Sequence, residues 1–566
     1  MIKDIEIENW RSIESLQIPL EPLTVLVGPN GVGKTAILNA IDFVLGSRWP
    51  GLNYLDVPRD FHSLDTSKAI RIRCSFEPNL NYTDSAGDDH EIGSLEYCCR
   101  PYKKAAGGKE VGDLHDDFYP LSPKGEKMMV VTERPQAGVK RKYGPLLRIN
   151  TGLKDQARVL TIGDRRSVSY HASGRRGSAL SILLASARKS FEKDVGGARS
   201  SFKEKYDAAL EALRTQAVKD VEEAVGDTAK QMLGFLGKGA VQNLEIGFGF
   251  ADPSNPFGSL SVLCKEGDLE LPAELMGLGI QSAIVVGVFD ALRKQNAQIG
   301  TIIIEEPEMY LHPQAQRFFH NLLVDMVDSG QCQVIYSSHS PVFADASRFE
   351  SLRLLQKPTG GTTTVARVSQ DSDLKYLEEQ RQRQKLGQYM DPASGEVLFA
   401  RRVLLVEGHG DYLAARIVAK KLNIDLDAES LSVIACGGKA AIPFFARLCR
   451  SLEIPAIILH DRDIQAGDSL TPKEIGENAK AKAQNDEIKS ASAETTQIFL
   501  VDPSLESILG IGQSAADKPM RVVSALEPLK VEELPKVLVD AVQALNNEPS
   551  DGEDDVSLDL SEQIVD

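Results

Sequence analysis

The chain has 566 residues, of which 42% are hydrophobic and 26% charged, and its formal net charge is −17 at pH 7. This length allows two to four domains, each with its own core. No apolar run reaches the 18 residues of a membrane-spanning helix. The charge argues against a nonspecific coat on a polyanion, because phosphate contact requires a local basic surface.

The N-terminus and the cysteines bear on location. Residues 1–6 include acids and lack the apolar segment of a signal peptide, so we expect a cytoplasmic protein. The cysteines show no C-x-x-C spacing, which is typical of small core side chains and not of a zinc site or a disulfide framework. They are Cys74, Cys98, Cys99, Cys264, Cys332, Cys436 and Cys449.

A phosphate-binding motif follows the first buried strand. Residues 1–45 alternate apolar and polar side chains, which predicts paired strands leading into a buried strand at 23–27. Residues 28–35 match G-x-x-x-x-G-K-[ST] and precede an apolar helical pattern at 36–41. Backbone N–H groups of such a loop close on phosphate oxygens, and the helix adds its positive end, whereas a plain glycine-rich turn is the alternative. We expect ATP and Mg²⁺ to contact Asn30, Gly31, Gly33, Lys34 and Thr35.

Two longer regions separate this motif from the next strand. Gly, Asp and Lys dominate residues 84–125, which indicates a surface excursion. Residues 178–236 carry apolar side chains at helical spacing, which predicts a helical insertion with a stripe that faces a partner. A helical layer packed on its own domain is an equal alternative.

Carboxylates end the next predicted strand, at 301–304. Glu305 would order the Mg²⁺ shell and Glu306 would polarise the attacking water. Strands often end in surface acids, but the preceding phosphate loop favours the functional reading. Residues 277–282 precede a helix and would present Gly279 and Gln281 to the γ-phosphate of a second subunit's ATP. His339 follows a strand at 333–336 and would contact the same phosphate, unless it is a packed core histidine.

The C-terminal third alternates strands and helices, which predicts a parallel sheet with ligands at the strand ends. Its strands lie at 402–406, 431–436, 456–459 and 498–501. Acids follow the first, third and fourth of these strands, and clustered hard oxygen ligands suit Mg²⁺ or Mn²⁺. Two such ions would activate water and stabilise the leaving oxygen in phosphodiester hydrolysis. The acids are Glu407, Asp411, Asp461, Asp463 and Glu506.

These motifs resemble known families. Residues 10–13 (Trp-Arg-Ser-Ile), the phosphate loop, Glu-Glu-Pro-Glu at 305–308 and Ser-Ser-His-Ser-Pro at 337–341 resemble the ABC-type ATPases of the SMC, RecF and OLD (overcoming lysogenization defect) group. Glu after one strand, Gly-Gly-Lys at 437–439 and D-x-D at 461–463 resemble the Toprim fold. ATPase first and Toprim second is the arrangement of OLD-family nucleases, which include the Gabija nuclease.

The resemblance implies an α/β fold in which an ABC-type P-loop ATPase domain with a helical insertion precedes a C-terminal Toprim domain. We expect the ATPase at 1–175 and 241–370, a dimerisation insertion at 176–240, a linker at 371–396, the Toprim domain at 397–547 and an acidic disordered tail at 548–566. Two departures from the ABC pattern occur. Glu305 replaces the usual Asp, and no Gln occurs between Gln17 and Gln136, so Asp60 is our substitute for the missing Q-loop glutamine.

For the Toprim domain, the resemblance implies DNA cleavage with two metals. Glu407 and Asp411 would bind one metal, Asp461 and Asp463 the site between, and Glu506 would complete the shell. Lys439 would approach a DNA phosphate, although the Gly-Gly-Lys run is also readable as a plain glycine turn. A lysine late in the chain would lie near the scissile phosphate, for which the candidates are Lys518, Lys530 and Lys536.

The resulting hypothesis is an ATP-dependent, metal-dependent DNA endonuclease. It would form a homodimer or a higher even oligomer, because the segment at 277–282 completes an ATP site only across a subunit boundary. The resemblance suggests anti-phage defence, with a helicase or a nucleic-acid sensor as an accessory component. The alternative is an SMC-like structural or sensor ATPase that binds DNA or a partner without cutting. A topoisomerase is disfavoured, because it would need a tyrosine nucleophile on a separate domain. A primase is excluded, because it would need a zinc module, which the cysteines do not provide.

Overall fold

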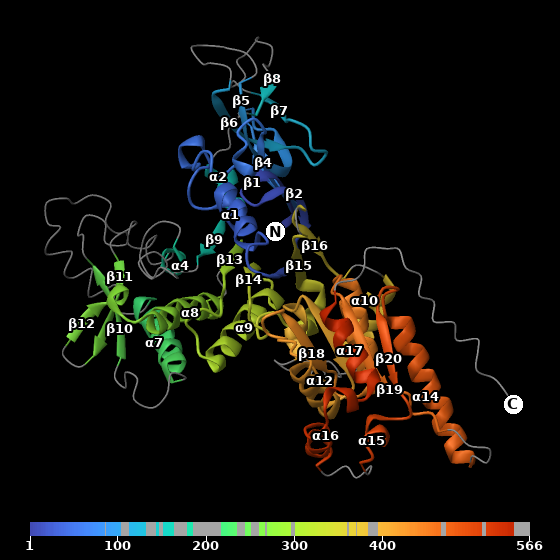
Figure 1. Cartoon of the computed structure of the whole chain (residues 1–566). Coiled ribbons are helices and arrows are strands. Elements are labelled where there is room, and N and C mark those ends of the chain that lie inside the picture. The colour runs from blue at the N-terminus through green and yellow to red at the C-terminus, as the bar shows by residue number, and fades with distance from the viewer. Residues whose placement is uncertain are drawn as a thin grey trace. The chain divides into compact units, whose positions relative to one another are not determined.

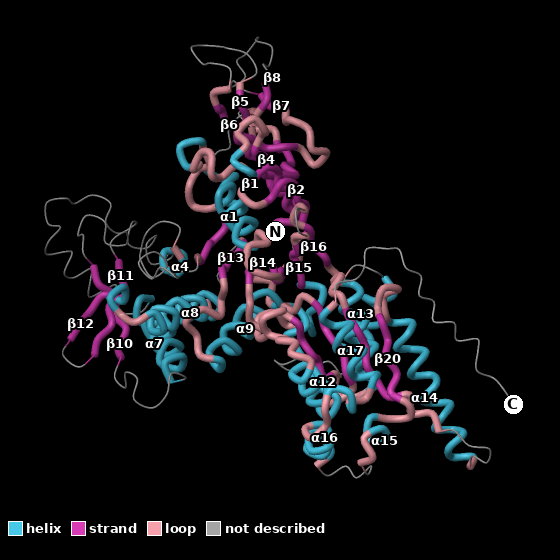
Figure 2. The backbone as a smooth tube through the Cα atoms, in the orientation of Figure 1, coloured by secondary structure: helices cyan, strands magenta, loops and turns pink. Residues whose placement is uncertain are grey.

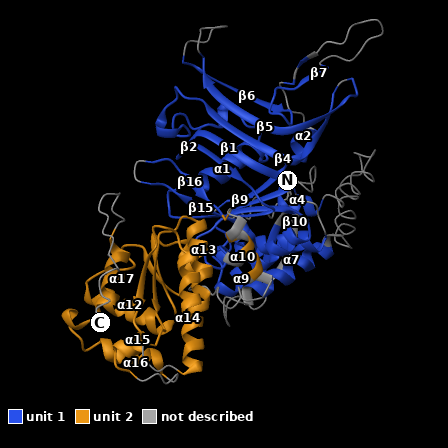
Figure 3. Ribbon diagram, turned by 90° about the vertical axis from the view of Figure 1, so that its right-hand side faces the viewer, with its two compact units in different colours: residues 1–367 blue, residues 368–566 orange. Residues whose placement is uncertain are grey.

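The computed structural model divides the chain into two compact units, residues 1–367 and 368–566 (Figure 3). None of the described helices is long and apolar enough to cross a membrane. The described residues are 1–84, 86–102, 112–131, 143–146, 151–163, 178–184, 217–234, 244–250, 260–266, 269–295, 300–358, 361–368, 371–382, 394–465, 471–511 and 517–547.

The first unit begins with a five-stranded antiparallel sheet in the order β2-β1-β4-β5-β6 (Figure 2). The expectation of a surface excursion at 84–125 is wrong for much of this segment, because it contributes the edge strand β6 and the largely buried β5. The acids and glycines that suggested a loop concentrate between the strands. The strands are β1 (Ile2–Trp10), β2 (Ile13–Pro19), β4 (Ile70–Thr83), β5 (Asp89–Pro101) and β6 (Leu114–Leu121).

A six-stranded sheet forms the centre of the unit, in the order β16-β15-β3-β14-β13-β9. All its pairs are parallel except β15 with β16, so the three predicted strands of this region lie side by side as expected. Helix α1 (Lys34–Leu45) packs between the two sheets, and its apolar face joins both to one core (Figure 1). The strands are β3 (Leu23–Val27), β9 (Val159–Ile162), β13 (Thr301–Glu305), β14 (Gln333–Ser337), β15 (Leu352–Gln356) and β16 (Thr364–Ala366).

A buried glutamine joins the first strand to the central sheet. The side-chain amide of Gln333 accepts from the Ile2 backbone N–H at 2.9 Å and donates to the Ile2 carbonyl at 2.7 Å. It also accepts from the Thr301 hydroxyl at 3.0 Å. These bonds satisfy a buried amide that would otherwise carry a desolvation cost.

The remaining elements of the first unit include helices within the predicted insertion. Helices α7 and α8 pack together, and α4 contacts α8. Residues 185–216 and 235–243 lie outside the described residues, so the predicted helical insertion is described only in α4 and α7. The elements are β7 (Met129–Val131), β8 (Tyr143–Pro145), α2 (Thr151–Gln156), α4 (Ala179–Leu183), α7 (Ala217–Gly234), β10 (Leu244–Phe250), β11 (Leu260–Glu266), β12 (Leu269–Pro272), α8 (Leu278–Lys294) and α9 (Pro313–Asp328).

The second unit is built on a four-stranded parallel sheet in the order β18-β17-β19-β20, as the alternating pattern predicted. Helices α12, α16 and α17 share one core with Leu404, Val406 and their neighbours on one face of the sheet. The elements are α10 (Asp371–Gln382), β17 (Arg402–Val406), α12 (His409–Lys421), β18 (Leu431–Ala435), α13 (Ile442–Ser451), β19 (Ala456–Asp461), α14 (Pro472–Ala491), β20 (Gln497–Val501), α15 (Leu505–Ile508), α16 (Lys518–Leu526) and α17 (Lys536–Asn546).

The segment predicted as a linker, 371–396, is partly structured. Its first half forms α10, whose Asp373 is fully buried against Arg450 and Ser451, so this half belongs to the second unit and is not a linker. The charged residues of this segment suggested a solvated linker. The burial of Asp373 has no local signal, because its partners lie about 80 residues later in the sequence. Residues 383–393 and the predicted tail at 548–566 lie outside the described residues.

Candidate functional site

The phosphate loop has the backbone that its glycines predict. Gly28, Gly31 and Gly33 have φ values of 138°, 80° and 109°, which side-chain-bearing residues rarely adopt. A Cβ on Gly28 would lie 2.3 Å from the Leu355 carbonyl oxygen, so only glycine fits there. The exposed backbone of Asn30, Gly31 and Thr35 surrounds the start of α1. The loop therefore has the conformational freedom and the helix N-terminus that an anion site requires.

Lys34 lies in this loop, and its ammonium group contacts the backbone of the loop. Its Nζ donates to the carbonyls of Gly28 at 2.7 Å and Pro29 at 2.8 Å. Burial lowers the pKa of Lys34 to about 8, although the carboxylates of Glu306 and Glu308 oppose this shift. A cation held at low hydration would gain most from a phosphate partner.

The acids after β13 face the end of β14. Glu305 is the register partner of Ser337, and the Glu306 N–H donates to the Ser337 carbonyl at 3.0 Å. Glu306 has a φ of 47°, which turns the chain sharply after the strand. His339 Nε2 lies 4.0 Å from Glu306 Oε1, and its pKa is lowered, first by burial and then by the charge of Lys34. Glu306, His339 and Lys34 are thus brought together as predicted.

Glu308 is a residue whose role the sequence reasoning missed. Its carboxylate accepts from the His339 backbone N–H at 2.6 Å and from the Ser338 hydroxyl at 3.0 Å. Burial is the main cause that raises its pKa. Glu308 therefore fixes the loop that carries His339, and the third acid of Glu-Glu-Pro-Glu was the available signal.

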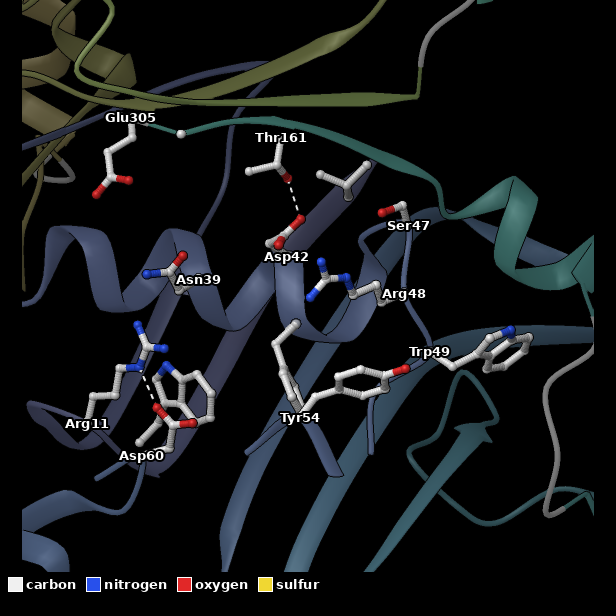
Figure 4. A pocket seen from close by; sticks show the side chains of 14 residues that line it. Arg11, Asn39, Asp42, Ser47, Arg48, Trp49, Tyr54, Asp60, Thr161 and Glu305 are labelled. Carbon is white, nitrogen blue, oxygen red and sulfur yellow. Dashed lines mark hydrogen bonds and ion pairs between the residues drawn. The ribbon is translucent and has the colours of Figure 1, made fainter. Parts of the chain in front are cut away.

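Figure 4 shows the cavity beside Glu305, which has a volume of about 660 Å³. Asp60, our substitute for the Q-loop glutamine, also lines it, but its carboxylate is bound to Arg11 at 2.8 Å. Asp42 accepts a hydrogen bond from Thr161 at 2.6 Å in the same cavity, and burial raises the pKa of Asp42. The role assigned to Asp60 stays a prediction.

The predicted signature segment begins α8. Gly277 caps the helix, and the Gln281 side chain donates to the carbonyls of Glu274 at 3.1 Å and Met276 at 2.8 Å. Gln281 thus holds the preceding turn, and Leu278 beside it is 46% exposed. The contact of Gly279 and Gln281 with a second subunit's ATP stays a prediction.

In the second unit, the strand ends bring the predicted acids together. Glu407 follows β17, and its Oε1 accepts from the backbone N–H of Asp461, which ends β19, at 2.8 Å. Asp461 Oδ1 accepts from the N–H of Leu505 at 2.9 Å, at the start of α15. Asp411 accepts from the Gly408 N–H at 3.0 Å. Adjacent parallel strands end at the same sheet edge, which explains this convergence.

The acids of this cluster perturb one another. Burial raises the pKa of Glu407 to about 7, and the charges of Asp411 and Asp463 add to the shift. Burial also raises the pKa of Asp461 to about 7, with further contributions from Glu407 and Asp411. Buried carboxylates that repel each other favour a cation or a proton between them.

Two lysines contact the cluster. Lys439 is buried, and its Nζ donates to the Asp461 carbonyl at 2.5 Å and to Asp463 Oδ2 at 2.9 Å. The Gly-Gly turn thus directs Lys439 toward Asp461 and Asp463, and the approach of residues 437–439 to a DNA phosphate stays a prediction. Lys518 forms an ion pair with Glu506, and its charge partly opposes the burial that raises the pKa of Asp411. This contact distinguishes Lys518 from the other late-lysine candidates, Lys530 and Lys536.

The donor set fits a divalent cation, because hard carboxylate oxygens are the ligands that Mg²⁺ and Mn²⁺ prefer. Within the described ranges, however, no three Asp, Glu, His or Cys side chains are grouped as they would be around a metal ion. Backbone amides and lysines hold the acids instead. The metal roles of Glu407, Asp411, Asp461, Asp463 and Glu506 stay predictions.

Comparisons with known proteins identify a domain in each part of the chain. A model of the AAA ATPase domain matches residues 1–344, and a model of the TOPRIM domain of overcoming lysogenization defect-like proteins matches residues 398–463. An OLD nuclease of Thermus scotoductus is 43% identical over 549 residues, which cover 96% of this chain and 98% of the relative. This chain belongs to the OLD nuclease family.

More distant OLD nuclease relatives share less of the sequence. The Old nuclease of Escherichia phage P2 is 23% identical over 500 residues, which cover 83% of this chain and 78% of that protein. Endonuclease GajA of Bacillus cereus is 22% identical over 227 residues, which cover 36% of this chain and 33% of that protein. This member of the family thus joins an ATPase domain to a Toprim nuclease domain, which confirms the predicted order and both predicted enzyme activities.

Proposed function

We propose that the chain is a divalent-metal-dependent DNA endonuclease whose cutting is linked to ATP. The observation that carries this proposal is the convergence of Glu407 and Asp461 at one sheet edge, where the Asp461 N–H donates to Glu407 Oε1 at 2.8 Å and the charge of Asp411 helps to raise the pKa of both carboxyls. A protein gains no stability from such repulsion. The arrangement of these carboxyls supports a site that selects a multivalent cation. A phosphodiester would then bind through that cation.

Each side chain has an assigned part. Glu407 and Asp411 would hold one Mg²⁺ or Mn²⁺, Asp461 and Asp463 the position between two, and Glu506 the outer shell. The metal supplies activation of water and charge stabilisation of the leaving oxygen. Lys518, already paired with Glu506, would neutralise the scissile phosphate. Lys439 fixes Asp463 and the Asp461 carbonyl, so that the D-x-D loop keeps its shape.

In the ATPase domain, the loop at 28–35 and Lys34 would bind the ATP phosphates, with Thr35 and Glu305 on Mg²⁺. Glu306 would orient the attacking water, and His339 would contact the γ-phosphate. The closeness of Lys34, Glu306 and His339 supports this assignment. A second copy would present Gly279 and Gln281 to the same nucleotide.

The proposed partners are DNA and a second copy of this chain. The exposed start of α8, with Leu275 and Leu278 on the surface, supports a subunit contact there. A role in antiviral defence, with a helicase or nucleic-acid sensor as accessory component, is the remaining part of the proposal, and the similarity to Endonuclease GajA supports it.

Nicking of supercoiled plasmid tests the nuclease proposal. Glu407→Ala, Asp461→Ala and Asp463→Ala should each lower the cleavage rate at least 100-fold, because each removes a carboxylate that offsets metal charge. ATP hydrolysis should stay near the wild-type rate, since the acids belong to a separate unit with its own core. Asp486→Ala, an exposed acid on α14, is the matched control and should cut normally.

Wild-type cleavage should require Mg²⁺ or Mn²⁺ and stop with EDTA, whereas Ca²⁺ should support little cutting because of its larger, looser shell. Full cleavage by Asp461→Ala and Asp463→Ala would refute the site. DNA binding and ATP hydrolysis without any cutting by the wild type would instead indicate an SMC-like structural or sensor ATPase.

A further inference from the structure

Helices α12 and α16 concentrate positive charge in a chain whose net charge is −17. Together they contain five basic residues and a single acid, Asp411, which belongs to the carboxylate cluster. Four of the basic side chains are exposed. A local basic surface of this kind is what an acidic protein needs to contact phosphates. The exposed residues are Arg416, Lys420, Lys518 and Arg521.

The two helices are held together and both begin at the acids. Lys421 Nζ donates to the carbonyls of Glu527 at 2.9 Å and Leu529 at 2.6 Å, which fastens the ends of the helices distant from the site. Helix α16 packs against the start of α12, where a Cβ on Gly410 would make an ordinary van der Waals contact with Val522 at 3.7 Å. α12 starts two residues after Glu407, and α16 starts at Lys518, the partner of Glu506. The basic surface is therefore continuous with the proposed cleavage site.

Planar side chains form a ladder along α12. The rings of His409 and Tyr412 stack with centroids 5.4 Å apart and an interplanar angle of 13°. The Arg416 guanidinium lies 5.6 Å from the Tyr412 centroid and donates to its hydroxyl at 3.3 Å. Spacings of three and four residues place all three on one helix face. His409 is exposed, so the ladder is open at the end nearest the acids.

A groove runs beside this ladder. Tyr412, Arg416 and Lys420 of α12 and Val523 of α16 line a cavity of about 820 Å³. At its far end Asp425, Asp427 and Glu527 line the wall, and these acids would repel a phosphate chain. The charge pattern thus favours contact with phosphates toward the helix starts and disfavours it beyond Lys420.

We propose that the α12–α16 face binds the DNA strand that flanks the scissile phosphate, with an unpaired base stacked on His409. Exposed Arg and Lys side chains contact the backbone phosphates, and the ring ladder accepts a base through its π-face. Stacking rings interleaved with cations are the chemistry of single-strand recognition, because every base has a face that stacks. The inference rests on the proposed nuclease function and specifies its substrate: DNA with unpaired bases next to the cut.

Binding is measured by fluorescence anisotropy on full-length protein in EDTA, so that cleavage does not interfere. The probes are a labelled single-stranded oligonucleotide and the same sequence fully paired. The double variant Arg416→Gln/Arg521→Gln should bind the single strand about tenfold more weakly. Its slope of log affinity against log salt should decrease by about 1.4, because each contact with a single strand contributes about 0.7.

His409→Ala should weaken binding of the single strand about fivefold and binding of the duplex less, because the duplex offers no unstacked base. Lys480→Gln/Lys482→Gln removes two exposed charges from α14, which is not part of the α12–α16 face, and should bind like the wild type. Arg416→Lys/Arg521→Lys should keep the salt slope. Melting temperatures confirm that each variant folds.

Wild-type affinity and salt slope in both Arg416→Gln/Arg521→Gln and His409→Ala would overturn the inference. Equal losses in Lys480→Gln/Lys482→Gln would overturn it as well, because binding would then depend only on total charge. Failure of the nuclease proposal gives a different result. In that case the wild type would cut no DNA with Mg²⁺ or Mn²⁺, while the α12–α16 variants would still bind DNA more weakly.

Discussion

Glu407 and Asp461 link the protonation of the second unit to its stability. Their pKa values of about 7 in the folded chain exceed the ordinary values of 4.5 and 3.8. The folded chain therefore binds more protons than the unfolded chain between about pH 4 and pH 7. The free energy of unfolding must fall as pH rises through this window and level off above it.

We expect the melting temperature of the second unit in EDTA to fall between pH 5.5 and pH 8. Glu407→Gln should flatten this dependence and should be more stable than the wild type at pH 8, because it removes a charge that burial and its neighbours disfavour. Each kcal/mol corresponds to roughly 2–4 °C. Excess Mg²⁺ at pH 8 should raise the melting temperature of the wild type more than that of Glu407→Gln. A melting temperature that rises with pH in EDTA would contradict the electrostatic account.

At the ATP site, substitutions of Lys34 and Glu306 should affect different steps, nucleotide binding and hydrolysis respectively. Lys34→Ala should weaken ATP binding at least tenfold, since it removes charge that acts on the ground state. Glu306→Gln should bind ATP normally and hydrolyse it at least 100-fold more slowly, because it removes the group that orients water. Titration with a fluorescent ATP analogue and a phosphate-release assay separate the two. Wild-type hydrolysis by Glu306→Gln would show that another group acts on water.

At the scale of single residues, the sequence predicted most of the side chains that lie close together at the phosphate loop and at the strand ends of the second unit. Acids that directly follow a strand are a local signal that places carboxylates at a sheet edge, and the glycines of residues 28–35 are a local signal for the backbone conformation of the loop. The inward direction of Lys439 could not be predicted, because it depends on a turn with two left-handed glycines, Gly437 and Gly438. Glu308 was missed because its partners, Ser338 and His339, come from another loop.

Among the elements, α10 depends on the buried carboxylate of Asp373, which forms ion pairs with two arginines of α13. Asp373 is fully buried, accepts from Ser451 at 2.8 Å and pairs with Arg450, and Arg447 lies over the Tyr376 ring at 3.8 Å. Asp373→Ala should lower the free energy of unfolding of the second unit by about 2 kcal/mol, because Arg450 would lose its carboxylate. Urea unfolding measures this effect. Glu379→Ala, on the exposed side of α10, should unfold like the wild type; equal stability of both variants would mean that α10 is not docked.

Helices and strands were easiest to predict where the pattern of apolar residues and a neighbouring sequence motif indicate the same element. The strands at 23–27, 301–304, 333–336 and 402–406 are short apolar runs bounded by recognisable turns. By contrast, β5 and α10 contain many polar residues, so composition alone assigned them to loops. Their burial depends on partners from other strands and helices, which a single sequence does not reveal.

At the scale of the whole molecule, nucleotide should control assembly. A second copy must supply the segment at 277–282 if our ATP site is correct, so Glu306→Gln with ATP should accumulate as a dimer or an even multiple. Light scattering at micromolar concentration measures the mass. Leu278→Asp, at an exposed position on α8, should lower the dimer fraction with ATP, whereas Ile475→Asp on α14 should leave it unchanged. A strict monomer in every nucleotide state would refute the shared site.

The pairing of β3 in the central sheet constrains how the protein is made. Leu23 pairs with Val334 and Val25 with Leu352, so β3 waits for partners made about 300 residues later. At typical synthesis rates of about 5–20 residues per second, this delay lasts roughly 15–60 s. The second unit instead pairs β17 with β18 within a short stretch of chain. Nascent chains should therefore expose, for about half of the synthesis of the 566 residues, a strand that is fully buried in the folded chain, which makes early arrest products prone to aggregation.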